Sequence, residues 1–311
     1  MASVVSVKEL TCWAVASVAV GMMFLATRLA EEPEMLFPEV GALAVGLVVV
    51  DKRVWSVRGW AAPLLMAMAA LLGVSMVRYV CLPLAVQLLI GFASVATLLT
   101  VSRSGLAPAI SACLLPILTG VTSWLYPLSV LGVTAVLVGM QWALERLGLR
   151  HELPAAVAVE PYVPCVRSLK TWGACLMALA PVLAFFQWVD WRFAMAPPLV
   201  VTFVEFATSR SGLRMRPLLT WGLLVGAASI GSAARLSCGG LPVEVVAAVV
   251  FVLILLLFRA ARKPFAPAAA IALVPFILPE SEVAWFVLRV AAGAGSLILL
   301  AKGIGKLVRM A

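Results

Sequence analysis

The sequence has little charge and a single histidine, and both shortages restrict what the protein can be. Asp, Glu, Lys and Arg make up 12% of the 311 residues, against about 25% in ordinary soluble domains. Hydrophobic residues make up 64% of the chain, and its mean hydropathy is +1.13. These few charges cannot cover the surface of a soluble domain of this size. The sequence therefore predicts an integral membrane protein.

The same shortages exclude most catalytic and metal sites. His151 has no second histidine to work with, and few carboxylates fall in apolar segments, so no acid–base pair is indicated. The chain has no P-loop, which argues against a primary pump. Its cysteines lack metal-ligand spacing, and we interpret them as small apolar residues; they are Cys12, Cys81, Cys113, Cys165, Cys175 and Cys238. We expect no enzyme, no metal and no cofactor.

What the sequence does contain is an internal repeat with an offset of 159 residues. Such a repeat constrains the architecture before any motif is considered, and in membrane transporters it helps to locate the substrate site. The matched residues are Trp13 and Trp172, Pro38 and Pro197, Leu82-Pro83 and Leu241-Pro242, Arg103 and Arg262, Ala107-Pro108-Ala109 and Ala266-Pro267-Ala268, and Pro116 and Pro275.

Charges and turn residues divide each half of the chain into six apolar segments. They lie near 10–30, 36–50, 61–79, 80–99, 107–118 and 124–143, and near 168–186, 194–208, 217–236, 241–258, 266–279 and 284–303. The sequence predicts an all-α polytopic protein of about 12 transmembrane segments in two tandem six-segment repeats, residues 1–147 and 167–311. Each repeat is compatible with an inverted 3+3 arrangement that contains short or re-entrant helices. The polar linker, 148–166, contains His151, which we interpret as solvated.

The distribution of basic residues predicts the orientation. If all twelve segments cross, 18 of the 23 Lys and Arg residues lie in loops on the side of the N-terminus. Acidic runs, at 31–34 and 280–282, lie on the opposite side. Because positive loops remain in the cytoplasm, we expect both termini there, in a bacterial inner (cytoplasmic) membrane. Topology then accounts for the net charge of +9 without a nucleic-acid partner.

Segments two and five of each half are too short to cross the bilayer as apolar helices, which takes about 20 residues. They begin at Pro38, Pro108, Pro197 and Pro267, and the stretches before Pro38, Pro108 and Pro267 cannot be regular helix. A helix N-terminus offers unpaired N–H groups and a positive dipole, which favour an anion. Segment two starts from outside and segment five from inside, so their N-termini are expected to face one point near the midplane. Alternatively, they are kinked parts of full spans without a site.

Glu39 is the strongest single candidate, because a carboxylate inside a membrane is costly and usually functional. Alternatively it caps a helix at headgroup level, and its repeat equivalent is Pro198. Arg103 and Arg262 precede short helices and either attract anions or serve as topology signals. Glu205 lies in an apolar segment, and Glu244 aligns with Ala85, which argues against a shared role. The expected substrate-binding residues are Phe37, Pro38, Glu39, Leu106, Ala107, Pro108, Pro197, Pro198, Phe265, Ala266 and Pro267.

Residues 267–275 read Pro-Ala-Ala-Ala-Ile-Ala-Leu-Val-Pro, and residues 108–116 are a looser copy. Both resemble the small-residue helix of the HPP family of integral membrane proteins, and residues 37–45 with Gly59-Trp60 resemble its upstream part. The family's His-Pro-Pro is only partly kept, since Leu106 and Phe265 replace its histidine. This resemblance implies two HPP-like units and a carrier for a small, nitrite-like anion. The Gly-rich helix after Arg210 more distantly resembles FUSC-type aromatic acid exporters.

The leading hypothesis is a transporter or channel for a small anion that binds at buried helix N-termini. An exporter of organic or aromatic acids is an alternative, and it predicts a broad cavity lined by aromatic residues. A non-transporting membrane scaffold is another, and it predicts that the short helices pack without a polar cavity. The expected partners are the lipid bilayer and a small anionic solute, with no nucleic acid. The sequence leaves open a homo-oligomer.

Overall fold

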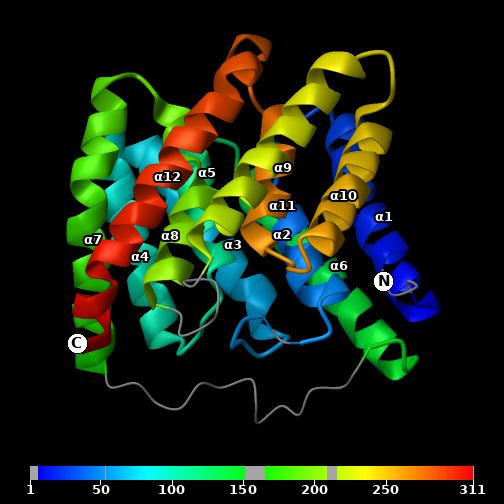
Figure 1. Cartoon of the computed structure of the whole chain (residues 1–311), viewed down its shortest axis with the longest axis horizontal. Coiled ribbons are helices and arrows are strands. Elements are labelled where there is room, and N and C mark those ends of the chain that lie inside the picture. Colours follow the sequence, from blue (N-terminus) through cyan, green and yellow to red (C-terminus); the bar gives the residue numbers. More distant parts are fainter. Residues whose placement is uncertain (1–5, 53, 151–164, 209–215, 311) are drawn as a thin grey trace.

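A computed structural model describes residues 6–310, except residue 53, residues 151–164 and residues 209–215 (Figure 1). The described part is all-helical, with 80% of residues in helices and no strands. The predicted all-α fold is therefore confirmed. His151 and most of the predicted linker, 148–166, lie outside the described residues.

Eight helices within the described part are apolar and long enough to cross a bilayer. Their length and composition indicate an integral membrane protein. Many of their large apolar side chains are exposed, as expected for helices that face lipid. These helices are α1 (Val7–Leu29), α3 (Ala61–Tyr79), α4 (Leu84–Val101), α6 (Leu125–Arg146), α7 (Cys165–Trp188), α9 (Pro217–Ser237), α10 (Val243–Ala260) and α12 (Glu280–Met310).

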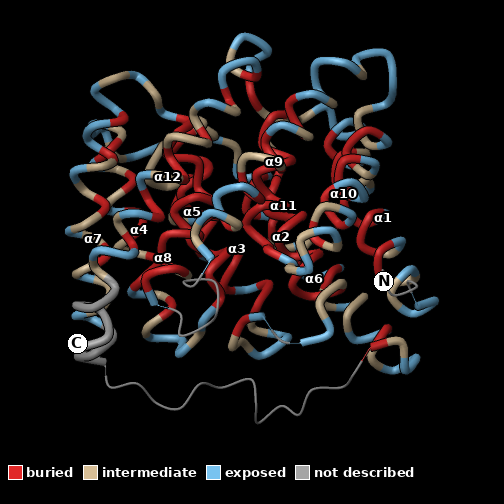
Figure 2. The backbone as a smooth tube through the Cα atoms, viewed as in Figure 1, coloured by how far each residue is buried: buried red, intermediate tan, exposed pale blue. Residues whose placement is uncertain are grey.

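Four shorter helices form the centre of the molecule (Figure 2). They are α2 (Val40–Ala44), which continues as a π-helical turn (Val45–Val49), α5 (Pro108–Thr119), α8 (Pro197–Thr208) and α11 (Ala266–Leu273), which is followed by a 3₁₀ turn (Val274–Phe276). Nearly every residue of these helices is buried. A helix that is apolar on all sides belongs in a core. The last residues before the short helices, Phe37, Leu106, Ala196 and Phe265, are buried as well, which is the condition for non-helical backbone at membrane depth. The turns farther upstream are exposed.

The same backbone turn precedes each short helix. Among the described residues, the non-glycine positions with positive φ are Glu31, Arg103, Asp190 and Arg262, at 51° to 55°. Each follows the last turn of a long helix, α1, α4, α7 or α10. The left-handed conformation terminates that helix, a role usually filled by glycine or asparagine. The four positions form two pairs separated by 159 residues.

Helices of the first half (up to residue 147) pack against helices of the second half (from residue 167) in four pairs: α1 with α10, α4 with α7, α5 with α8, and α2 with α11. Ion pairs join both ends of α1 and α10. Arg28 lies 2.9 Å from Glu244, and Glu9 lies 3.5 Å from Arg259. The start of each helix thus lies beside the end of the other, so α1 and α10 are antiparallel.

A related contact joins α4 and α7. The side-chain oxygen of Gln187 accepts a hydrogen bond from the backbone N–H of Ala85. Gln187 and Ala85 are the positions that match Arg28 and Glu244 at the repeat offset. The same two positions therefore connect the halves at both interfaces, once by an ion pair and once by a hydrogen bond.

Candidate functional site

The four short helices meet at one small central cavity. Its volume is about 10 Å³ for the centre of a water-sized sphere, which is room for about one water molecule. Every short helix contributes residues from its start. The lining consists of Glu39 and Ala42 at α2, Trp55 in the following loop, Pro108 and Ser111 on α5, Pro198, Val201 and Glu205 on α8, and Ala266, Pro267 and Ala270 on α11.

Most lining residues occur as matched pairs at the repeat offset. The pairs are Glu39 and Pro198, Ala42 and Val201, Pro108 and Pro267, and Ser111 and Ala270. Residues at matching sequence positions of the two halves therefore line one shared cavity. The polar groups do not follow this symmetry, because Pro198 and Ala270 replace Glu39 and Ser111 in the second half.

Glu39 is buried at the start of α2, with 1% of its surface exposed. The hydroxyl of Ser111 donates a hydrogen bond to its Oε1, whereas Oε2 has no hydrogen-bond partner. The side chain does not cap α2. The N–H of Val40 bonds instead to the Phe37 carbonyl. A buried carboxylate oxygen without a partner is costly, so this oxygen marks a place where a proton or a ligand binds.

The wall behind Glu39 is aromatic. Tyr126 of α6 is fully buried, and its hydroxyl donates to the Ala112 carbonyl at 3.1 Å. Its ring meets Phe37 edge-on, with ring centroids 6.0 Å apart. The Tyr126 hydroxyl thus donates its hydrogen bond to the backbone and not to Glu39.

Glu205 and Trp55 complete the polar lining. Glu205 is only partly buried, and it occupies the position that matches Gly46. The ring of Trp55 packs on Gly46, where a Cβ atom would lie 2.4 Å from the ring carbons. The indole N–H faces the Glu205 carboxylate but closes no hydrogen bond of normal geometry. The Trp55 loop is anchored at the next residue, where the Ser56 carbonyl accepts from the N–H of Gly105 at 2.9 Å.

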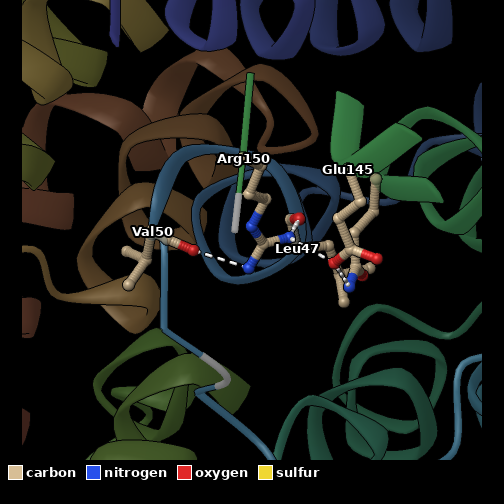
Figure 3. Close-up of polar contacts among 5 residues, drawn as sticks. Leu47, Val50, Glu145 and Arg150 are labelled. Atoms are coloured by element: carbon tan, nitrogen blue, oxygen red, sulfur yellow. Dashed lines mark hydrogen bonds and ion pairs between the residues drawn. The ribbon is translucent and has the colours of Figure 1, made fainter. Parts of the chain in front are cut away.

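A buried cation lies at the other end of the α2 segment (Figure 3). Arg150 is 5% exposed, and its guanidinium donates to the carbonyls of Leu47 and Val50. Its Nη1 also lies 4.0 Å from a Glu145 oxygen. The arginine thus satisfies carbonyls that the end of a helix leaves unpaired.

The predicted site residues fall into three groups. Glu39, Pro108, Pro198, Ala266 and Pro267 line the cavity. Arg103 and Arg262 are exposed, at the left-handed turns. The remaining predicted residues are buried at the starts of the short helices but do not line the cavity; they are Phe37, Pro38, Leu106, Ala107, Pro197 and Phe265.

Sequence reasoning missed Ser111, Trp55 and Glu205 as site residues. A carboxylate within an apolar helix was an available signal for Glu205. Ser111 gave none, because a serine in an apolar helix is common. Glu244 has no acidic counterpart in the first half and was not predicted as a site residue. It lies in the interface between α1 and α10.

The turn before α11 gathers basic residues. Partial burial, together with repulsion from Arg216, lowers the pKa of Lys263 below its ordinary value. Arg262 is the adjacent residue, so three cations lie close to this turn. Clustered charge of one sign raises the local concentration of oppositely charged solutes.

The site combines two carboxylates, a hydroxyl and an indole N–H around the space of one water. Within the described residues, no group of three or more His, Cys, Asp or Glu side chains can hold a metal ion. The arrangement is suited to a proton and a small solute. Comparison of the chain with protein-family models, with curated proteins and with solved structures found no match.

Proposed function

We propose that the protein transports a small anion, of about the size of nitrite, along one path between its two halves. The observation that carries this proposal is the central cavity, where the starts of four short helices and several polar side chains converge. The eight long helices enclose these short helices. Polar groups at the centre of a membrane protein are costly and mark solute pathways.

The proposed architecture is twelve segments in two tandem six-segment units, residues 1–147 and 167–311. Helix bounds support it, because α10 (Val243–Ala260) is α4 (Leu84–Val101) shifted by 159 residues. Each unit also repeats one pattern twice: a long helix, a left-handed turn, a short helix and a long helix. Because three segments are an odd number, this pattern supports an inverted 3+3 arrangement.

The proposed location is a bacterial cytoplasmic membrane with both termini in the cytoplasm. The excess of basic residues in loops on the N-terminal side supports that orientation. The short helices are proposed to be re-entrant. Membership of the HPP family, from the resemblance of residues 267–275, is part of the same proposal.

The residues that line the cavity favour a small solute over an aromatic acid. An aromatic-acid exporter requires a broad aromatic-lined cavity, whereas Trp55 is the one aromatic residue in this lining. A scaffold without transport gives no reason for two carboxylates at the centre. The cavity is closed to nitrite in this conformation, because α2 and α11 touch: a Cβ on Gly41 would lie 2.9 Å from the Ala269 carbonyl oxygen. Transport therefore requires the short helices to separate.

Flux measurements in proteoliposomes test the proposal. Nitrite, nitrate, formate and benzoate are supplied under a pH gradient, with protein-free vesicles as background. We expect nitrite-sized anions to move well above background and benzoate to stay excluded. If no anion moves, while the purified protein binds another membrane protein, the scaffold alternative is correct.

A variant connects the flux to the short helices. Proline fixes φ and lacks an N–H, so replacing Pro108 and Pro267 by alanine adds donors and loosens two helix starts. We expect a several-fold lower flux. The matched control is Pro217→Ala, because Pro217 begins the long helix α9 and does not line the cavity. Equal flux in both variants contradicts a role for the short helices.

A further inference from the structure

Two carboxylates line one cavity that has room for about one water molecule. A binding site for an anion requires no negative charge, so these carboxylates need another explanation. Glu39 comes from the α2 segment and Glu205 from α8, so each half supplies one. Glu39 is almost completely buried, whereas Glu205 keeps some exposure. A proton from solvent therefore reaches Glu205 more readily than Glu39.

The surroundings do not compensate two negative charges. None of the described lining residues is Lys, Arg or His. α2 packs against α1, α6 and α11, and α8 packs against α5, α7, α11 and α12. α11 has no titratable side chain. Among the described residues, the buried titratable side chains on the other packed elements are Cys12 on α1, Tyr126 on α6, Cys113 on α5 and Cys175 on α7. Arg150 donates to a carbonyl of the π turn, and Arg289 of α12 is paired with Glu282.

A carboxylate in a poorly solvated site without a cation favours its neutral, protonated form. Glu39 and Glu205 both line such a site, so at least one of them holds a proton. An anion adds a further negative charge to the same space. It can be accommodated only when both carboxylates are neutral.

We infer that Glu39 and Glu205 carry protons in step with the anion, so that the protein is a proton–anion cotransporter. This inference rests on the proposed anion transport. In the resting state Glu39 holds one proton, and Glu205 takes a second proton from the aqueous side, so both carboxyls are neutral when the anion enters. Glu39 then releases its proton on the other side together with the anion. The O–H bond of Glu205 breaks as its proton passes to a water in the cavity, and that water gives a proton to Oε2 of Glu39, which restores the resting state.

Ser111 and Trp55 assist this exchange. The Ser111 hydroxyl donates a hydrogen bond to Oε1 of Glu39, which leaves Oε2 as the oxygen that takes the proton. The Trp55 N–H is a donor to the water or to the anion. One proton and one monovalent anion move together, so the cycle carries no net charge.

The test measures proton and anion movement together. Proteoliposomes contain a pH-sensitive dye, the membrane potential is clamped at zero, and an inward nitrite gradient is applied at equal pH. We expect the wild-type protein to acidify the lumen by one proton per nitrite above the protein-free background. Glu39→Gln and Glu205→Gln should each reduce the acidification per nitrite at least tenfold. Glu244→Gln is the matched control, because it neutralises a carboxylate outside the cavity, and it should keep the wild-type ratio.

The outcomes separate the two claims. If the wild-type protein moves no anion, the proposed function fails. If it moves nitrite without protons, or if a sodium gradient replaces the proton gradient as the driving force, the cotransport inference is overturned while anion transport stands. The inference is also overturned if both glutamine variants elute as folded protein and keep the wild-type ratio. Should Glu39→Gln misfold, Glu205→Gln and the wild-type stoichiometry decide.

Discussion

Glu39 and Ser111 form a polar pair that exists in only one half of the molecule. The matched positions in the second half are Pro198 and Ala270, so both members of the pair differ together. A hydroxyl that donates to a buried carboxylate has little reason to be kept once the carboxylate is absent. The polar groups that line the cavity from the first half thus have apolar residues at the matching positions of the second half.

Ser111→Ala tests this pair and gives α5 the residue that α11 has. The change leaves a buried carboxylate oxygen without its donor, which costs about 1–3 kcal/mol. We expect a lower midpoint of thermal unfolding in detergent. The control is Ser94→Ala, because the Ser94 hydroxyl bonds only to a carbonyl of its own helix, that of Ile90. Equal midpoints for the two variants contradict the assigned contact.

At the residue scale the sequence predicted Glu39 but neither Ser111 nor Glu205. The reason is that the repeat selects positions that are the same in both halves, whereas these polar groups differ between them. Gly46 stands where the second half has Glu205, and it is required there by the packing of Trp55. The contact of residue 39 with residue 111 arises from tertiary packing, which a linear pattern does not contain.

At the scale of helices, the four short elements were predictable and the turns before them were not. Prolines and flanking charges mark the starts of α5 and α8 to the residue. The left-handed turns fall on Glu31, Arg103, Asp190 and Arg262 instead of on glycine, and charged side chains give no signal for that conformation. Arg103 and Arg262 therefore have a backbone role in ending α4 and α10.

The ion pair that joins α1 to α10 can be introduced between α4 and α7. Gln187→Arg with Ala85→Glu places on α7 and α4 the ion pair that Arg28 and Glu244 form on α1 and α10. We expect a coupling of about 0.2–1 kcal/mol between the two changes, because Gln187 is exposed and surface pairs are weak. A double-mutant cycle from thermal unfolding measures it.

The reversed pair, Gln187→Glu with Ala85→Arg, is the control for that exchange. It keeps opposite charges but places a carboxylate at the last turn of α7 and a cation at the first turn of α4, against both helix dipoles. We expect it to be less stable than the exchanged pair. A zero coupling energy in the first pair would mean that the two interfaces are not equivalent.

At the scale of the whole molecule, the repeat predicted similar halves but not how they dock. Internal similarity is equally compatible with two separate cavities or with one. In the structure α5 packs on α8 and α2 on α11, so each half completes the other's surface around one cavity. The shared cavity follows from an interface, and interfaces between repeats depend on side chains such as Arg28 and Glu244 that the repeat does not conserve.

Splitting the chain tests whether the halves are interdependent. Residues 1–150 and 160–311 are expressed together, with an affinity tag on the first fragment. Because four helix pairs join the halves, we expect the second fragment to copurify and the complex to unfold at nearly the temperature of the intact chain. Reversing the charges at both ends of α1, by Glu9→Arg with Arg28→Glu, sets like charges against Arg259 and Glu244 and should lower the yield of complex. If the first fragment is monodisperse alone and does not retain the second, each half folds independently. That result would contradict a cavity that depends on both halves.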